Sequence, residues 1–148
     1  MPDYVLGMNC KIFAGPAGTA LASLTELTNV KDVNVGLEAG EADVTTRANS
    51  GWRATASTLK ESTIEFEMVW KPGDTGFDMF QAAFLANTNV SMAALTGALA
   101  TANSDGPYGD WSVTNFSRSE PLEEATTASV TCKLAVWDAW IEDGAEAV

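Results

Sequence analysis

The stretch 40–70 constrains the fold of this chain more than any other part of the sequence. Over residues 62–71 apolar side chains recur at every second position, which is typical of a strand whose two faces differ. One face carries Ile64, Phe66, Met68 and Trp70, and the other carries Thr63, Glu65, Glu67 and Val69. Burying two unpaired carboxylates is costly. We therefore predict that the apolar set packs in the core and that Glu65 and Glu67 face solvent.

A long polar segment, residues 43–59, precedes this strand and shows no sustained apolar period. Connections this long inside a compact domain are usually functional or disordered. The segment contains Arg47, Trp52 and Arg53, whose residue types are enriched in protein–protein interfaces. We expect a long loop through which copies of the chain bind one another. Alternatively, the arginines pair with glutamates of the same subunit and Trp52 folds back on the core.

The rest of the chain predicts mostly strands and a single helix. Phe77, Phe80 and Phe84 recur at helical spacing, so we predict a helix over 75–86, capped by Asp74 or Thr75 and ended at Asn87. Strands are expected over 8–14, 21–27, 30–39, 62–71, 89–95, 111–120 and 128–136, with an acidic C-terminal tail over 138–148. This pattern predicts one domain, 1–148, folded as a β-sandwich or barrel with one flanking helix.

Charge and residue types exclude several functions. With 20 acidic and 8 basic residues the net charge is -12, which argues against binding nucleic acid through its phosphates. The chain has no histidine, the commonest general base and metal ligand. Glu65 and Glu67 share a face, but adjacent glutamates on one strand usually form a solvated face. We expect no catalytic residues, no cofactor and no metal site.

The two cysteines and the hydropathy pattern indicate the state of the thiols and whether the chain enters a membrane. Cys10 and Cys132 do not make a zinc site without histidine, and we expect both to be reduced, packed thiols. No apolar run is long enough to span a bilayer, so we expect no membrane association.

Two segments, 41–70 and 111–134, resemble the tail tube proteins of long-tailed bacteriophages. The strongest parts are DVTTR at 43–47 and FSRSEPLE at 116–123. The order also agrees: a strand, a long polar loop, a strand, a short helix after a Pro-Gly turn, and paired strands. The resemblance covers most of the chain. It does not extend to the first ten residues or to the part after Trp137.

The resemblance implies a structural virion protein that forms rings, hexameric in the family, stacked into a hollow tail tube for DNA delivery. A related fold builds the tubes of type VI secretion. The implied ring-stacking loop comprises Asp43, Thr45, Thr46, Arg47, Asn49, Trp52 and Arg53. Glu65 and Glu67 would line the lumen and repel DNA, which passes without specific binding; the alternative is that they face the outside of the tube.

The resemblance also implies partners and a location. The partners would be copies of the chain itself and other tail proteins, such as the tape measure, terminator and baseplate proteins. The location would be the virion tail, after assembly in the host bacterial cytoplasm.

A rival function is a β-sandwich binding module for a carbohydrate or protein ligand, which would display aromatic residues such as Trp52, Tyr108 and Trp111.

Overall fold

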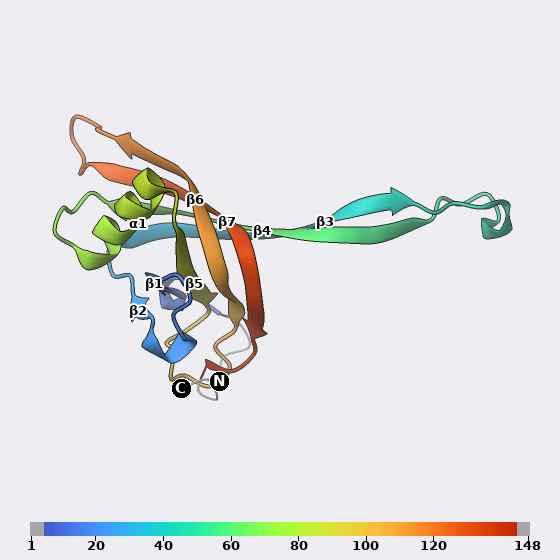
Figure 1. Cartoon of the computed structure of the whole chain (residues 1–148), viewed down its shortest axis with the longest axis horizontal. Coiled ribbons are helices and arrows are strands. Elements are labelled where there is room, and N and C mark those ends of the chain that lie inside the picture. Colours follow the sequence, from blue (N-terminus) through green and yellow to red (C-terminus); the bar gives the residue numbers. More distant parts are fainter. Residues whose placement is uncertain (1–4, 145–148) are drawn as a thin grey trace.

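The structure, a computed structural model, describes residues 5–144 and contains one sheet and one α-helix. The elements in chain order are β1 (Lys11–Pro16), β2 (Thr25–Glu26), β3 (Val30–Asp43), β4 (Thr55–Val69), α1 (Thr75–Ala86), β5 (Asn89–Leu95), β6 (Gly106–Ser119) and β7 (Thr127–Ile141). The strands pair antiparallel throughout, in the order β2-β1-β5-β6-β7-β4-β3 (Figure 1). The predicted class, mostly β with one flanking helix, is confirmed.

The main core lies on one face of the sheet, where α1 packs. Ile64, Phe66 and Met68 of β4 are buried there, as the alternation predicted. Trp111 is fully buried, and its indole N–H donates a hydrogen bond to the carbonyl of Met92 at 3.1 Å. A smaller cluster on the other face of β1 and β5 holds Phe13, Leu21, Leu24, Ala93 and Leu95. Strand β5 is therefore buried on both sides.

The helix begins and ends where the sequence predicts. The Asp74 carboxylate accepts a hydrogen bond from the Phe77 amide at 3.1 Å, which satisfies a donor that the first helical turn leaves free. Asn87 ends the helix in the left-handed conformation, with φ of 57°. Phe80 packs edge to face on Phe66, with ring centroids 5.3 Å apart. Phe77 and Phe80 thus belong to the core, whereas Phe84, at the end of the helix, is exposed.

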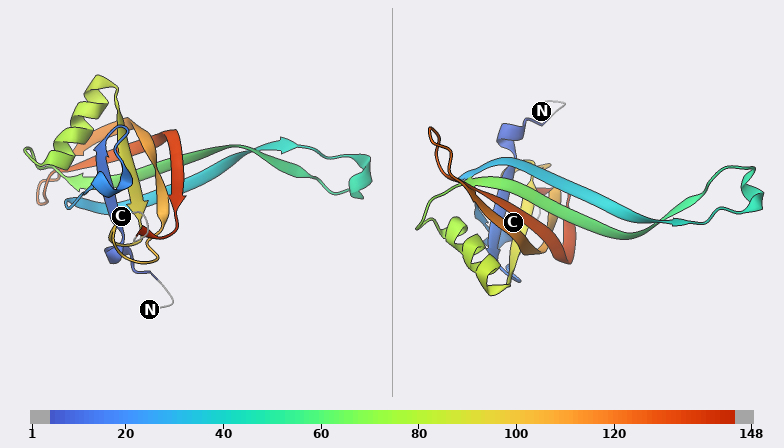
Figure 2. Two further views of the ribbon diagram at one scale, coloured as in Figure 1. Left: turned by 60° about the horizontal axis from the view of Figure 1, so that its bottom comes forward. Right: turned by 90° about the horizontal axis from the view of Figure 1, so that it is seen from above.

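A long hairpin arm projects from the body of the molecule (Figures 1 and 2). β7 pairs with β4 only over residues 63–69, so the earlier part of β4 pairs with β3 alone. We call this two-stranded part, 37–62, the arm, and its connecting segment, 44–54, the tip. The prediction of a loop over 43–59 was wrong in its extent. Residues 55–61 are strand, although they carry no apolar period because neither face packs on the core.

Other bounds also differ from the predictions. β6 starts at Gly106, inside a segment expected to be a loop, and residues 21–27 form a short 3-10 helix and the two-residue β2. β7 continues to Ile141, so 138–141 are strand and not tail, and 145–148 lie outside the described residues.

The two cysteines have different surroundings. Both are free thiols, but Cys10 is exposed, against the expectation that it would be packed. Cys132 is buried opposite Ile64, and this burial raises the pKa of its thiol to about 12.

Candidate functional site

The tip of the arm is a compact turn held by its own hydrogen bonds. The Asp43 carboxylate accepts from the Thr45 amide at 2.9 Å. Hydrogen bonding by the Thr45 side chain, and then by its amide, lowers the pKa of Asp43. The Thr45 hydroxyl also accepts from the Ala54 amide at 2.9 Å. The Asn49 side chain donates to the Trp52 carbonyl at 3.0 Å. Asp43, Thr45 and Asn49 therefore shape the tip, and Thr46 leads into its 3-10 turn.

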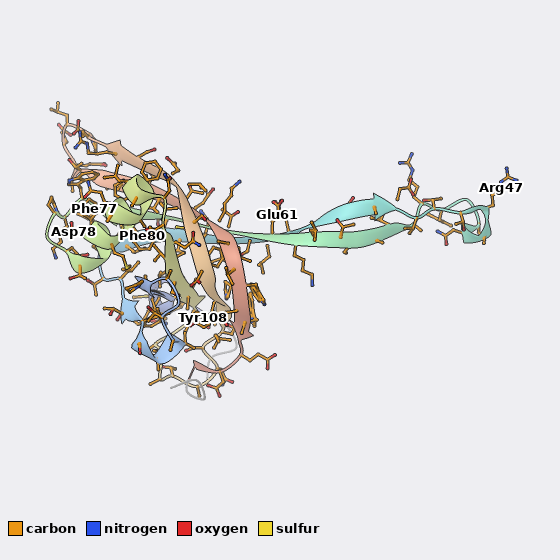
Figure 3. All side chains as sticks on the ribbon, in the orientation of Figure 1. Arg47, Glu61, Phe77, Asp78, Phe80 and Tyr108 are labelled. Carbon is orange, nitrogen blue, oxygen red and sulfur yellow. The ribbon has the colours of Figure 1, made fainter. Side chains whose placement is uncertain are left out.

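The remaining tip residues are presented to solvent. Trp52 is 76% exposed, which contradicts the alternative that it folds back on the core. Arg47 and Arg53 are exposed, and neither forms an ion pair with any residue of the described chain. Figure 3 shows Arg47 at the far end of the arm, away from the acidic body. A net charge of +2 thus sits on the tip of a chain whose total is -12.

The second predicted feature, the polar face, lies in the body and not on the arm tip. Residues directly opposite each other on neighbouring strands share a face. Two rows cross β3, β4, β7 and β6 in this way on the face away from the core. The first row is Asn34, Glu65, Thr131 and Asn115. The second row is Lys31, Glu67, Ser129 and Ser117. Every side chain in these rows is hydrophilic, and none is fully buried.

The charges on this polar face are more mixed than the sequence suggested. Lys31 is opposite Glu67, and Lys133 is opposite Thr63, so cations on β3 and β7 accompany the two glutamates. Glu61 is opposite Glu38 where the arm leaves the body, a pairing that was not predicted (Figure 3). Like charges directly opposite each other destabilise a sheet. Glu38 and Glu61 add negative charge to the polar face. This pair depends on the register of β3 and β4, which is not visible in the sequence.

Both outer edges of this part of the sheet are open. Within the described part of the chain β3 pairs only with β4, which leaves the other edge of its 14 residues without a strand partner there. β5 pairs with β6 only over 108–112, so the same edge of β6 is free over 113–119. Exposed edges are pairing surfaces for other chains. The four strands β6-β7-β4-β3 therefore form a sheet that can be extended at both sides.

Metal-binding, membrane-spanning and aromatic features were the other candidates in residues 5–144. These residues contain no group of three or more potential metal-binding side chains, and none of their helices is long and apolar enough to cross a membrane. Trp111 lies in the core, and Tyr108 is half-buried with its hydroxyl donating to the Thr19 carbonyl. Of the three aromatic residues named for a carbohydrate-binding module, Trp52, Tyr108 and Trp111, only Trp52 is exposed.

Comparison with protein families decides between a tail tube protein and a binding module. A family described as phage tail tube protein matches residues 11–136, most of the chain. The chain belongs to this phage tail tube protein family. It is a structural protein of the tail tube, as the two sequence segments led us to expect. No curated protein sequence matches the chain.

Solved structures with a similar fold come from tails and related assemblies. The tail of an empty gene transfer agent (GTA) particle with C6 symmetry matches at a TM-score of 0.72 and 14% identity, covering 94% of this tail tube protein and 98% of that chain. The SPP1 tail tube matches at a TM-score of 0.72 and 14% identity, covering 95% of this tail tube protein and 80% of that chain. The anti-feeding prophage baseplate matches at a TM-score of 0.63 and 6% identity, covering 99% of both chains. At these identities the likeness shows the fold alone.

Proposed function

We propose that this tail tube protein forms closed rings in which the β6-β7-β4-β3 sheets of neighbouring subunits join edge to edge. The observation that carries the proposal is the pair of open edges on β3 and β6. Each strand of this sheet is antiparallel to the next, so β6 runs opposite to β3. In a rotationally symmetric ring, the β6 edge of one subunit therefore meets the β3 edge of the next in antiparallel pairing.

The closed sheet would form the wall of the bore. One face packs on α1 and the core, so only the polar face is free to line a channel. Small hydroxyl and amide side chains suit a wall that DNA must pass without binding. Glu38, Glu61, Glu65 and Glu67 outnumber Lys31 and Lys133 on this face, so the face repels phosphates on balance. The C6 symmetry of the similar GTA tail favours six subunits for each ring. An outward orientation of Glu65 and Glu67 is the alternative that the experiments below test.

The arm would connect successive rings. Its basic, aromatic tip projects from an acidic body. Arg47 and Arg53 form no ion pair within residues 5–144, and the Trp52 side chain is exposed. A contact between a projecting arm and a different surface of another copy is heterologous, and such contacts continue into filaments. Other partners at the tube ends would be tape measure, terminator and baseplate proteins. The protein would act in the virion tail without enzymatic activity, after assembly in the host cytoplasm.

Negative-stain microscopy of the purified protein tests the proposal. We expect rings or hollow tubes, whose number rises with protein concentration because assembly is a mass-action process. A monodisperse monomer that binds glycans in a panel of immobilised sugars would instead support a binding module.

A further inference from the structure

Strand β3 carries an apolar stripe that residues 5–144 leave largely exposed. Val33 and Val35 are each 41% exposed, and Leu37 is 55% exposed. Val33 is opposite Phe66 and Val35 is opposite Ile64, so the stripe lies on the core side of the sheet. Val30, at the start of β3, packs against the core, but Val33, Val35 and Leu37 stay exposed because β3 is the outermost strand. We call Val33, Val35 and Leu37 the β3 stripe.

The β3 stripe borders a groove that runs between β3 and the β1–β2 edge of the same subunit. The groove has a volume of about 860 Å³. Apolar side chains lining it include Met8, Ile12, Leu27, Val33 and Val35. Met8 is 85% exposed. An apolar groove beside an open strand edge is a surface on which another chain can both pair and pack.

A second exposed apolar pair lies at the end of α1. Leu85 is 73% exposed and Phe84 is 37% exposed. Phe84 stacks on Phe116 of β6, with ring centroids 6.4 Å apart. Asn89, which begins β5 just after the helix, is opposite Ser112 of β6, where the free edge of β6 starts. The C-terminal end of α1 therefore lies on the core side of β6 beside its free edge.

We infer that the end of α1, with Phe84 and Leu85, packs on the β3 stripe of the next subunit and enters its groove. The inference rests on the proposed ring, because the β6 edge must meet the β3 edge. When the two edges join in one sheet, the core side of one subunit continues into the core side of the next. The helix end on one side of the seam and the stripe on the other then face each other, and both lose their exposed apolar surface.

The chemistry of the helix end suits this occupant. Asp78 is the last charged residue of α1, and the segment after it, 79–87, is neutral and mostly apolar. The charged residues that line the groove are Lys11, Glu26, Lys31 and Asp32. Lys11 and Glu26 pair with each other at 2.8 Å, and Lys31 and Asp32 are exposed. A neutral apolar segment adds no charge of its own to this groove and so brings no carboxylate or ammonium group that would need a partner there.

Crosslinking across the seam tests the inference. A variant with Val35→Cys and Leu85→Cys in a Cys10→Ser background is assembled and treated with a short bismaleimide. Cys132 is buried and does not compete for the reagent. We expect a ladder of covalent oligomers in assembled protein and none in dilute monomer. The matched control replaces Val35→Cys by Asn34→Cys. Asn34 lies one position along the same edge and borders the same groove, but it belongs to the opposite face of the sheet, so the control should give a much weaker ladder.

A charge placed on the seam provides a second readout. Leu85→Asp should raise the concentration needed for ring formation about tenfold or more, while the exposed position of the side chain leaves subunit melting unchanged. Ala82→Asp adds the same charge to an exposed position of the same helix and should have little effect.

The outcomes separate the inference from the proposed ring. Rings that form normally but give no ladder with Val35→Cys and Leu85→Cys, or an equal ladder with Asn34→Cys, overturn the inference and leave the ring intact. Normal rings with Leu85→Asp do the same. A Cys10→Ser parent that forms no rings at any concentration overturns the proposed function itself, and the inference with it.

Discussion

Reversing the charge of both tip arginines, with Arg47→Glu and Arg53→Glu, should abolish tube formation while the subunit folds normally. Neither arginine has an ion-pair partner in the described chain, so the fold loses no contact. At an interface, arginine hot spots contribute about 2 kcal/mol or more each, and each such loss weakens binding about 30-fold. Sedimentation and electron microscopy measure tube formation, and thermal melting checks the fold.

A matched variant separates the position of the charge from its amount. Lys60→Glu with Lys71→Glu changes the net charge by the same amount but leaves the tip unaltered, and it should still form tubes. If the tip variant forms tubes as readily as this control, the arm tip is not the contact between rings.

Changing Glu65→Lys and Glu67→Lys should leave tubes largely intact but slow the passage of DNA. Neither carboxylate forms an ion pair or a hydrogen bond that the subunit would lose. The second change places two lysines opposite each other, because Lys31 is opposite residue 67, at a cost of up to about 1 kcal/mol. In the bore, cations repeated in every ring would attract phosphates, and we expect ejection about tenfold slower or more at low salt.

Salt dependence shows whether the effect arises in the bore. Added salt shortens the reach of the attraction, so the ejection defect should shrink as ionic strength rises. Glu123→Lys with Glu124→Lys adds the same charge to the exposed turn between β6 and β7 and should eject normally. Normal ejection by the Glu65 and Glu67 variant at low salt would place both residues outside the channel.

The helix and the central strands could be predicted because their signals are local. The Asp74 cap, the phenylalanine spacing and Asn87 fix α1 within one stretch of sequence, and the structure has the predicted bounds. The alternation in 62–71 likewise reflects one face on the core and one in solvent. Where a strand has one buried face, its period reports its structure.

The arm and the role of β3 could not be predicted, for a physical reason. Residues 55–61 pair with β3 but pack on nothing, so they carry the composition of a loop. Val33 and Val35 alternate like core residues, yet they lie on the outermost strand and stay exposed. If another subunit packs on Val33 and Val35, the sequence of one chain shows their apolar alternation but not the surface that buries them. Strand order and register, which place Glu38 opposite Glu61, arise only in the folded sheet.

Cryo-electron microscopy of the assembled protein tests the central claim most directly. We predict stacked rings in which β6 of one subunit pairs antiparallel with β3 of the next, so that the polar face with Glu65 and Glu67 surrounds the bore. A reconstruction in which these edges stay unpaired, or in which Glu65 and Glu67 lie on the outer surface, would contradict it.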